Sequence, residues 1–142
     1  MDTLARLGWV WDGTVNDPRG TIESICRREI NDVLQIFSVK GAVRSNHYHK
    51  TDWHICYVVR GHVEWFERPA DSDETPVRTV LRQGDYIYTK PMIEHTSVFL
   101  ENTVLLAFCG CVREKENYEE DIVRCQDLSV VYRYPDLAKG RV

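Results

Sequence analysis

Residues 41–61 read GAVRSNHYHKTDWHICYVVRG, and residues 84–95 read GDYIYTKPMIEH. These two segments hold four of the chain's five histidines: His47, His49, His54 and His95. Side chains at positions i and i+2 of a strand point to the same face, so His47 and His49 can present both imidazoles to one point. His54 follows a short bend and can return to that point, whereas His95 needs a fold that brings distant strands together. The spacing therefore indicates a histidine cluster inside a β-barrel.

Outside these segments, short apolar or alternating runs recur between turn signals about every 8–12 residues. Examples are TIESIC, VLQIFSV, HVEWFER, VRTVLR and TVLLAFC. No segment longer than two turns shows the 3.6-residue period of an amphipathic helix. A chain of 142 residues suits one domain. The pattern predicts an all-β sandwich or barrel with little helix, in a single domain over residues 1–142.

Composition narrows the range of partners and compartments. The net charge is −4, and Lys and Arg are scattered among Asp and Glu, so we expect no nucleic-acid partner. No apolar run approaches the roughly 18 residues of a membrane span, and the start of the chain does not resemble a signal peptide. The five cysteines are odd in number and unevenly spaced, which predicts free thiols rather than a disulfide framework. We expect a cytoplasmic protein without membrane contact.

The two segments together resemble the motifs of the cupin superfamily, G-x5-H-x-H-x4-E-x6-G and G-x5-7-P-x-G-x2-H. The resemblance implies a double-stranded β-helix, or jelly-roll barrel, with its motif core at residues 41–95. This chain departs from the pattern in three ways. His54 stands where the family usually has Glu, Met92 and Ile93 replace the usual Gly, and Phe99 replaces a frequent Asn.

The first departure makes the predicted metal site all-histidine. We expect one divalent ion on His47, His49, His54 and His95, and four neutral ligands leave the ion its full charge as a Lewis acid. Imidazole suits Fe, Zn and Ni, which we rank first, and also Mn, Co and Cu. The alternative interpretation is that His54 is a hydrogen-bonded core residue outside the coordination sphere, and that the other histidines form a degenerate site that has lost its metal.

A looser resemblance extends over residues 17–126, to the dTDP-4-keto-6-deoxyglucose 3,4-ketoisomerases. It rests on DPRGTI at 17–22, RSNHYHK at 44–50, PMI at 91–93, and TVLLAF followed by ENYEEDIVR. In that family the histidine pair transfers protons without a metal, which would make His47 or His49 a catalytic base. In this chain a metal competes for the same nitrogens.

Further candidate site residues are less specific. Tyr48, Tyr86 and Tyr88 lie in or beside the histidine segments, and a phenol near the metal would serve as acid, base or substrate anchor. Core packing is the competing explanation for each tyrosine. Arg19 and Arg44 match basic positions of the ketoisomerase pattern and are candidates for binding substrate phosphate, although either would equally serve as a solvated or paired arginine.

These features lead to one leading hypothesis and two alternatives. The leading hypothesis is a metal-dependent enzyme that isomerises or epimerises a ketosugar, a sugar nucleotide or a similar oxygen-rich small molecule. The alternatives are an Fe(II)-dependent dioxygenase and a non-catalytic metal- or ligand-binding module. By analogy with similar cupins, we expect a homodimer.

Overall fold

The structure is a computed structural model that describes residues 14–136. Its strands are β1 (Thr14–Asp17), β2 (Gly20–Glu23), β3 (Asp32–Ser38), β4 (Val43–His49), β5 (His54–Arg60), β6 (His62–Pro69), β7 (Val77–Arg82), β8 (Tyr86–Thr89), β9 (Ile93–Phe99), β10 (Thr103–Cys109) and β11 (Ile122–Arg124). Its two helices are short, α2 (Lys115–Asp121) and α3 (Leu128–Arg133). The chain is therefore mostly β, as predicted.

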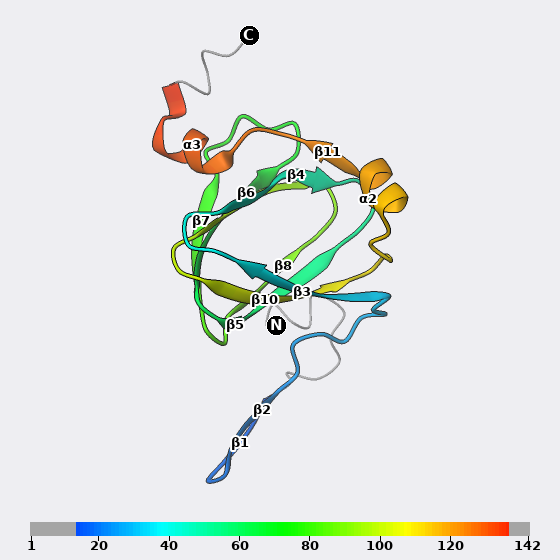
Figure 1. Cartoon of the computed structure of the whole chain (residues 1–142), viewed down its shortest axis with the longest axis vertical. Coiled ribbons are helices and arrows are strands. Elements are labelled where there is room, and N and C mark those ends of the chain that lie inside the picture. The colour runs from blue at the N-terminus through cyan, green and yellow to red at the C-terminus, as the bar shows by residue number, and fades with distance from the viewer. Residues whose placement is uncertain (1–13, 137–142) are drawn as a thin grey trace.

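Two antiparallel sheets face each other. One has the strand order β3-β10-β5-β8 and the other β11-β4-β9-β6-β7. Figure 1 shows the sheets curving around a common interior, while the β1–β2 hairpin extends away from them. This jelly-roll arrangement confirms the predicted cupin fold class. It also brings segments that are distant in sequence to one interior, as His95 requires.

Strand β10 illustrates why these residues form strands. Its side chains alternate between buried and half-buried along the whole strand, which is the period-2 pattern of a strand with one face in the core. The core between the sheets consists of Cys56, Val58, Val63, Trp65, Leu81, Phe99, Leu105, Ala107 and Cys109. Helix α3 covers Phe66 on the other side of the five-stranded sheet, with Leu128 and Val131 buried against it. Full burial of a Leu, Val or Phe side chain contributes about 1.5–3 kcal/mol to the free energy of folding.

Two turns show how the chain meets or departs from the cupin motifs. Gly61, between β5 and β6, has a φ of +119°, and a Cβ there would overlap Thr103, so glycine is needed. Met92 precedes β9 in the turn where the motif has Gly, and its φ of 66° lies in the same left-handed region. Met92 thus adopts a backbone conformation that glycine adopts more readily, and its side chain is 43% exposed.

Two further features concern the cysteines and the helices. All five cysteines lie in the described range and are unpaired, as predicted. Neither α2 nor α3 has the length and apolar character that crossing a membrane would require.

Candidate active site

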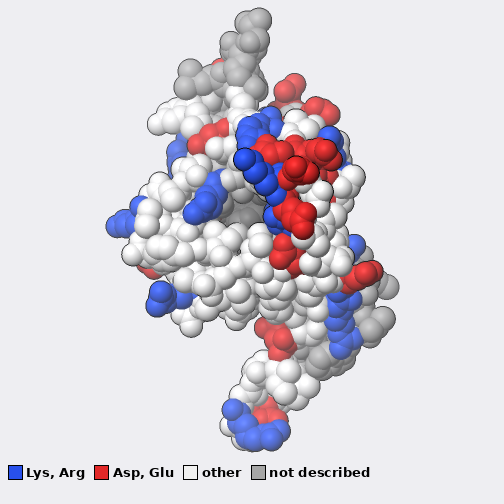
Figure 2. Space-filling view, turned by 45° about the vertical axis from the view of Figure 1, so that its right-hand side comes forward, with Lys and Arg blue, Asp and Glu red and all other residues white. Residues whose placement is uncertain are grey.

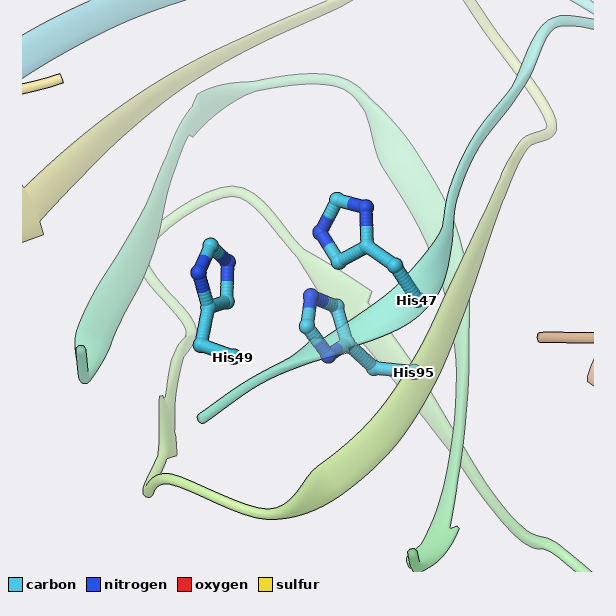
Figure 3. Close-up of side chains that lie close together, drawn as sticks. All are labelled: His47, His49 and His95. Carbon is cyan, nitrogen blue, oxygen red and sulfur yellow. The ribbon is translucent and has the colours of Figure 1, made fainter. Parts of the chain in front are cut away.

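Four histidines meet between the two sheets. His47 and His49 come from β4 and His95 from β9, all in the five-stranded sheet, whereas His54 comes from β5 in the four-stranded sheet. All four are buried. The ring centroid of His47 lies 4.8 Å from that of His95 and 4.9 Å from that of His49. The ring centroids of His54 and His95 are 4.9 Å apart. Figure 3 shows the rings of His47, His49 and His95 converging on one space.

A β-bulge in β4 helps to aim this cluster. Ser45 pairs with Thr96 and His47 with His95, so Asn46 is an extra residue in β4. Ser45 and Asn46 both have positive φ, which Asn tolerates better than most residues. The Asn46 side chain accepts a hydrogen bond from Thr96 Oγ1 at 2.8 Å, which holds the bulge to β9. Bulges recur beside active sites, where they re-aim side chains.

Hydrogen bonds orient two of the imidazoles. His49 Nδ1 lies 3.1 Å from Asp121 Oδ2, and His95 Nδ1 lies 3.0 Å from the carbonyl oxygen of Ile93. Both partners are acceptors, so Nδ1 carries the proton and Nε2 keeps a lone pair. His49 Nε2 is buried and has no hydrogen-bond partner among residues 14–136. An orphaned buried nitrogen of this kind suits a metal ion or a substrate proton.

His54 completes the cluster from the opposite sheet. Its Nε2 lies 3.3 Å from His95 Nε2, and its Nδ1 lies 3.5 Å from the Cys56 sulfur. Two nitrogens bound about 2.0–2.1 Å from one tetrahedral zinc ion would be about 3.3 Å apart. Without an ion, His54 donates from Nε2 to His95, because the Nε2 of His95 keeps its lone pair. The Nε2 distance to His95 thus allows a shared ion or a histidine–histidine hydrogen bond. His47, His49 and His95 have ligand nitrogens within 4.8 Å of one another, and His54 does not join this group.

The environment keeps the four imidazoles neutral. Burial, followed by the nearby His95 and His49, lowers the pKa of His47 to about 2. Burial likewise lowers the pKa of His95 to about 4 and that of His54 well below its ordinary value. The pKa of His49 is lowered by burial, although its Asp121 hydrogen bond acts in the opposite direction. Metal ligation requires neutral imidazoles, so this state is the binding-competent one.

Asp121, at the end of α2, is held by a dense set of hydrogen bonds. Its Oδ1 accepts from the backbone N–H and the hydroxyl of Thr51 at 2.8 and 2.6 Å, and its Oδ2 accepts from the backbone N–H of Asp52 at 3.2 Å. Burial raises the pKa of Asp121, but these hydrogen bonds outweigh it and lower the pKa below its ordinary value. Asp121 is therefore ionised and fixes the ring of His49.

The histidines line a cavity of about 380 Å³, a size typical of small-molecule sites. Trp65 stacks on His95 with an interplanar angle of 2°. Phe99 and Leu105 contribute apolar side chains to the cavity lining. The polar lining includes Arg44, Arg113 and Tyr118. Figure 2 shows a hollow in one face of the molecule, with Lys or Arg side chains on both sides and acidic side chains nearby.

The two predicted arginines have different positions. Arg44 lines the cavity, where its Nε donates to Ser38 Oγ at 2.7 Å and its Nη2 to the Phe37 carbonyl at 3.1 Å. Arg19 lies on the β1–β2 hairpin, and its side chain is 89% exposed and paired with Asp17 at 2.8 Å. In this chain Arg19 is outside the cavity, because the hairpin stands away from the sheets (Figure 1).

None of the three predicted tyrosines lines the cavity. Tyr48 lies between His47 and His49 on β4, so strand alternation turns it to the opposite face. Tyr86 and Tyr88 lie on β8, and the Tyr88 hydroxyl accepts from Arg28 Nη1 at 2.9 Å. The phenol in the cavity is Tyr118 of α2, whose ring centroid is 5.9 Å from His47.

Tyr118, Asp121 and Arg113 were not predicted from the sequence. They follow β10, outside both histidine segments, and no spacing rule links them to the histidines. The segment ENYEEDIVR contributed to the looser resemblance but carried no site prediction. The useful signal would have been a phenol and a carboxylate three residues apart on a short helix, which is too common to be specific.

No protein-family model matches the chain, and no curated protein matches it by sequence. Several solved structures, however, are similar to this chain in fold. A 3,4-ketoisomerase from Thermoanaerobacterium thermosaccharolyticum, in complex with TDP, has a TM-score of 0.63 at 22% identity, over 85% of this chain and 91% of that one. A 3,4-ketoisomerase from Helicobacter canadensis gives 0.63 at 17% identity, over 87% and 92%.

A dTDP-4-dehydrorhamnose 3,5-epimerase from Sulfolobus tokodaii is also similar, with a TM-score of 0.59 at 20% identity, over 73% of this chain and 69% of that one. At these identities the likeness shows the fold. The chain therefore has the fold of the sugar-nucleotide cupins, which the sequence resemblance implied.

Proposed function

We propose that this protein is an isomerase or epimerase of a ketosugar, supplied as a sugar nucleotide, and that its four histidines hold one divalent metal ion. The observation that carries the proposal is the convergence of four neutral, buried imidazoles in one small-molecule cavity. The fold supports the substrate class, because the similar structures include sugar-nucleotide isomerases and epimerases.

The residues fit a metal ion. His49 offers an orphaned Nε2, His95 offers an Nε2 whose ring is fixed through Nδ1, and His54 and His95 stand at a ligand-like separation. Fe, Zn and Ni are the ions that we expect first for an all-imidazole site. When bound, such an ion supplies a Lewis acid that polarises the substrate carbonyl.

Tyr118 is then the residue that moves the proton next to the carbonyl. With the histidine lone pairs engaged, its phenol and the Cys56 thiol are the acid–base groups left among the cavity's lining residues, and burial raises the pKa of the thiol to about 12. Burial raises the pKa of Tyr118, while Arg113 and Arg124 act to lower it. The charge of a nearby dication would act in the same direction as these arginines.

The pair formed by His49 and Asp121 favours a second candidate, the same isomerisation without a metal. A histidine oriented by an ionised carboxylate through Nδ1 can take a proton at Nε2, and the carboxylate stabilises the resulting imidazolium. In this version His49 is the base and Tyr118 the acid. One nitrogen cannot serve as ligand and base together, so metal removal separates the two versions.

The test is an exchange experiment with dTDP-4-keto-6-deoxyglucose in deuterated water, followed by NMR. The protein is purified without an affinity tag, its metal content is measured, and metal-free and reloaded samples are compared. We expect deuterium at a carbon beside the ketone, with activity that returns when the metal is added back.

Equal activity of the metal-free and reloaded samples would favour the His49 mechanism. No exchange in either sample with a panel of ketosugar nucleotides would contradict the proposal, and oxygen uptake by iron-loaded protein would point to the dioxygenase alternative.

We also propose that the protein is a homodimer. Val33 and Phe37 lie on β3, an edge strand of the four-stranded sheet, and are 51% and 52% exposed. Exposed apolar side chains that share one strand face suit burial against a second copy of the chain.

A further inference from the structure

Arg113 stands beside the histidine cluster on a rigid support. It lies between β10 and α2, and its backbone N–H donates to Asp32 Oδ2 at 2.8 Å. Its Nε donates to Asp52 Oδ2 at 2.8 Å, and the two side chains are 12% and 2% exposed. The guanidinium carbon lies 5.7 Å from the ring centroid of Tyr118. Arg113 is thus a largely buried cation in a fixed position.

Asp52 is itself fixed, which limits how the guanidinium can turn. Its Oδ1 accepts from the backbone N–H groups of Trp53 and Cys111 at 2.8 and 3.0 Å. One edge of the guanidinium is therefore anchored to a buried carboxylate that is itself held by two backbone N–H groups. The Nη2 of Arg113 is buried and has no hydrogen-bond partner among residues 14–136. A buried donor of this strength normally has an acceptor.

Arg44, the other arginine that lines the cavity, differs from Arg113 in its hydrogen bonds and burial. Arg44 uses Nε and Nη2 in bonds to Ser38 and Phe37, and the residue is exposed, so it has no buried donor without a partner. Arg113 lines both the histidine cavity and an adjoining pocket that contains Lys50 and Asn117. A donor that is buried, fixed and unsatisfied in such a place is suited to an oxygen of a bound molecule.

We propose that Arg113 binds the reacting oxygen of the substrate through Nη2 and stabilises the negative charge that forms on it. This inference rests on the proposed function. In the step concerned, the C–H bond beside the ketone breaks and its proton goes to the base, which is Tyr118 as phenolate or His49. The C–H electron pair forms a carbon–carbon double bond, and the carbonyl π pair moves onto oxygen. That oxygen becomes an enolate, which accepts from Nη2 until the proton returns.

Charge and geometry both favour this role. A charge-assisted hydrogen bond to an anionic oxygen is shorter and stronger than one to a neutral ketone, so the interaction grows as the enolate forms. The Arg113 and Asp52 side chains are 12% and 2% exposed, so little solvent screens this cation. Arg113 also acts to lower the pKa of His47, His49, His54 and His95, which agrees with a cation placed near all four rings. The competing assignment is that Arg113 binds a phosphate of the nucleotide.

The first test uses formate, a planar anion that is small enough for the cavity and weakly chelating. Formate protection is measured as the shift in melting temperature of the protein as purified, against potassium chloride at equal ionic strength. The variants are Arg113→Gln and Arg113→Lys. The matched control is Arg68→Gln, because Arg68 also has a buried Nε–carboxylate pair, to Glu94 at 2.8 Å, but lies outside the cavity.

We expect the formate affinity of both Arg113 variants to fall at least tenfold, with Arg68→Gln unchanged. Arg113→Lys keeps a cation beside Asp52 but lacks the second donor, so its melting temperature should stay closer to that of the wild type than that of Arg113→Gln. If Arg113→Gln does not fold, Arg113→Lys alone decides. Equal formate affinity in wild type and Arg113→Lys would overturn the proposal.

The second test separates enolate from phosphate. For Arg113→Lys with dTDP-4-keto-6-deoxyglucose, we expect kcat to fall about 10²–10³-fold, the loss typical of one oxyanion donor, with little change in KM. TDP affinity should be unchanged. Loss of TDP binding with formate binding intact would overturn the proposal in favour of a phosphate site. If wild-type protein binds formate through Arg113 but turns over no ketosugar, the proposed function fails and the anion site stands.

Discussion

The Nε2 atoms of His54 and His95 lie 3.3 Å apart although the two residues belong to opposite sheets. If this pair shares a metal ion, His54→Glu should keep the ion, because Glu supplies an oxygen ligand at the same position. Its negative charge should weaken the Lewis acidity of the ion. His54→Ala should bind the ion more weakly, because a ligand is lost. Elemental analysis and metal titration of the two variants measure this.

His62 is the matched control, because it is the remaining histidine and does not line the cavity. His62→Ala should keep the metal content of the wild type. Unchanged metal affinity in both His54 variants, with a lowered melting temperature for His54→Glu from a buried unpaired charge, would remove His54 from the coordination sphere.

Asp121 should matter through His49 rather than through direct contact with substrate. Asp121→Asn keeps the size of the side chain but replaces an ionised acceptor with an amide, so His49 loses orientation and basicity. We expect metal affinity or turnover to fall about 10–100-fold, as is typical for such outer partners. Glu119→Gln, on the same helix but in an exposed pair with Arg124, is the control and should behave as wild type. Equal metal affinity and turnover in Asp121→Asn would contradict this role.

Tyr118→Phe tests which phenol serves the cavity. Removing one hydroxyl should lower kcat about 10²–10⁴-fold while the metal content and the melting temperature stay close to those of the wild type. Tyr88→Phe loses only the hydrogen bond from Arg28, outside the cavity, and should leave kcat unchanged. The reverse result would restore the tyrosine assignment made from the sequence.

The lowered histidine pKa values predict how the stability of the metal-free protein depends on pH. The folded pKa values of His47 and His95 are about 2 and about 4, below the ordinary 6.5. Between these values the unfolded chain binds protons that the folded chain does not, so stability is present above about pH 6.5 and is lost as pH falls. Urea unfolding at pH 7.5, 6.5 and 5.5 should show this loss, and His47→Gln should reduce it.

Glu67 supplies the control for that experiment. Burial raises its folded pKa to about 6, so its contribution has the opposite sign and is lost as pH rises through 6. Glu67→Gln should therefore make the acid loss steeper rather than shallower. A flat profile for wild type between pH 7.5 and 5.5 would contradict neutral buried histidines.

The dimer predicted for the β3 face has a direct test. Phe37→Glu places a charge on the face of β3 that exposes Val33 and Phe37, and it should convert a dimer to a monomer in analytical ultracentrifugation. Val130→Glu, at a 46% exposed position on α3, should leave the association state unchanged. A monomeric wild type across micromolar concentrations would refute the prediction.

The sequence predicted the cavity's histidines well because strand periodicity is local. His47 and His49 share a face by their spacing alone, and the turn glycines frame the strands that bring His54 and His95 to them. The bulge at Asn46 was not predictable, because it depends on pairing with β9. Because the bulge breaks the alternation of β4, strand periodicity could not place Ser45 and Arg44 relative to the cavity. Arg44 was named only from the family resemblance.

The three tyrosines named from the sequence lie outside the cavity lining for a different reason. Tyr48 was placed near the metal by its neighbours in sequence, although adjacent strand residues face opposite sides. Tyr118 was missed because α2 has no buried residue and no side-chain N-cap hydrogen bond, so nothing in the local pattern marks it as a helix. Its place over the cavity comes from the long-range hydrogen bonds between Asp121 and the Thr51 region.

The division of the four histidines between two sheets has a mechanical consequence. An ion bound to His54 and to the β4 and β9 histidines would join the sheets at a point where otherwise the His54–His95 hydrogen bond and side-chain packing hold them together. Separation of the sheets would then require breaking metal–nitrogen bonds. Amide protons of β5 and β9, which exchange with solvent when the sandwich opens, should exchange more slowly in the metal-loaded protein, and those of the β1–β2 hairpin should not change.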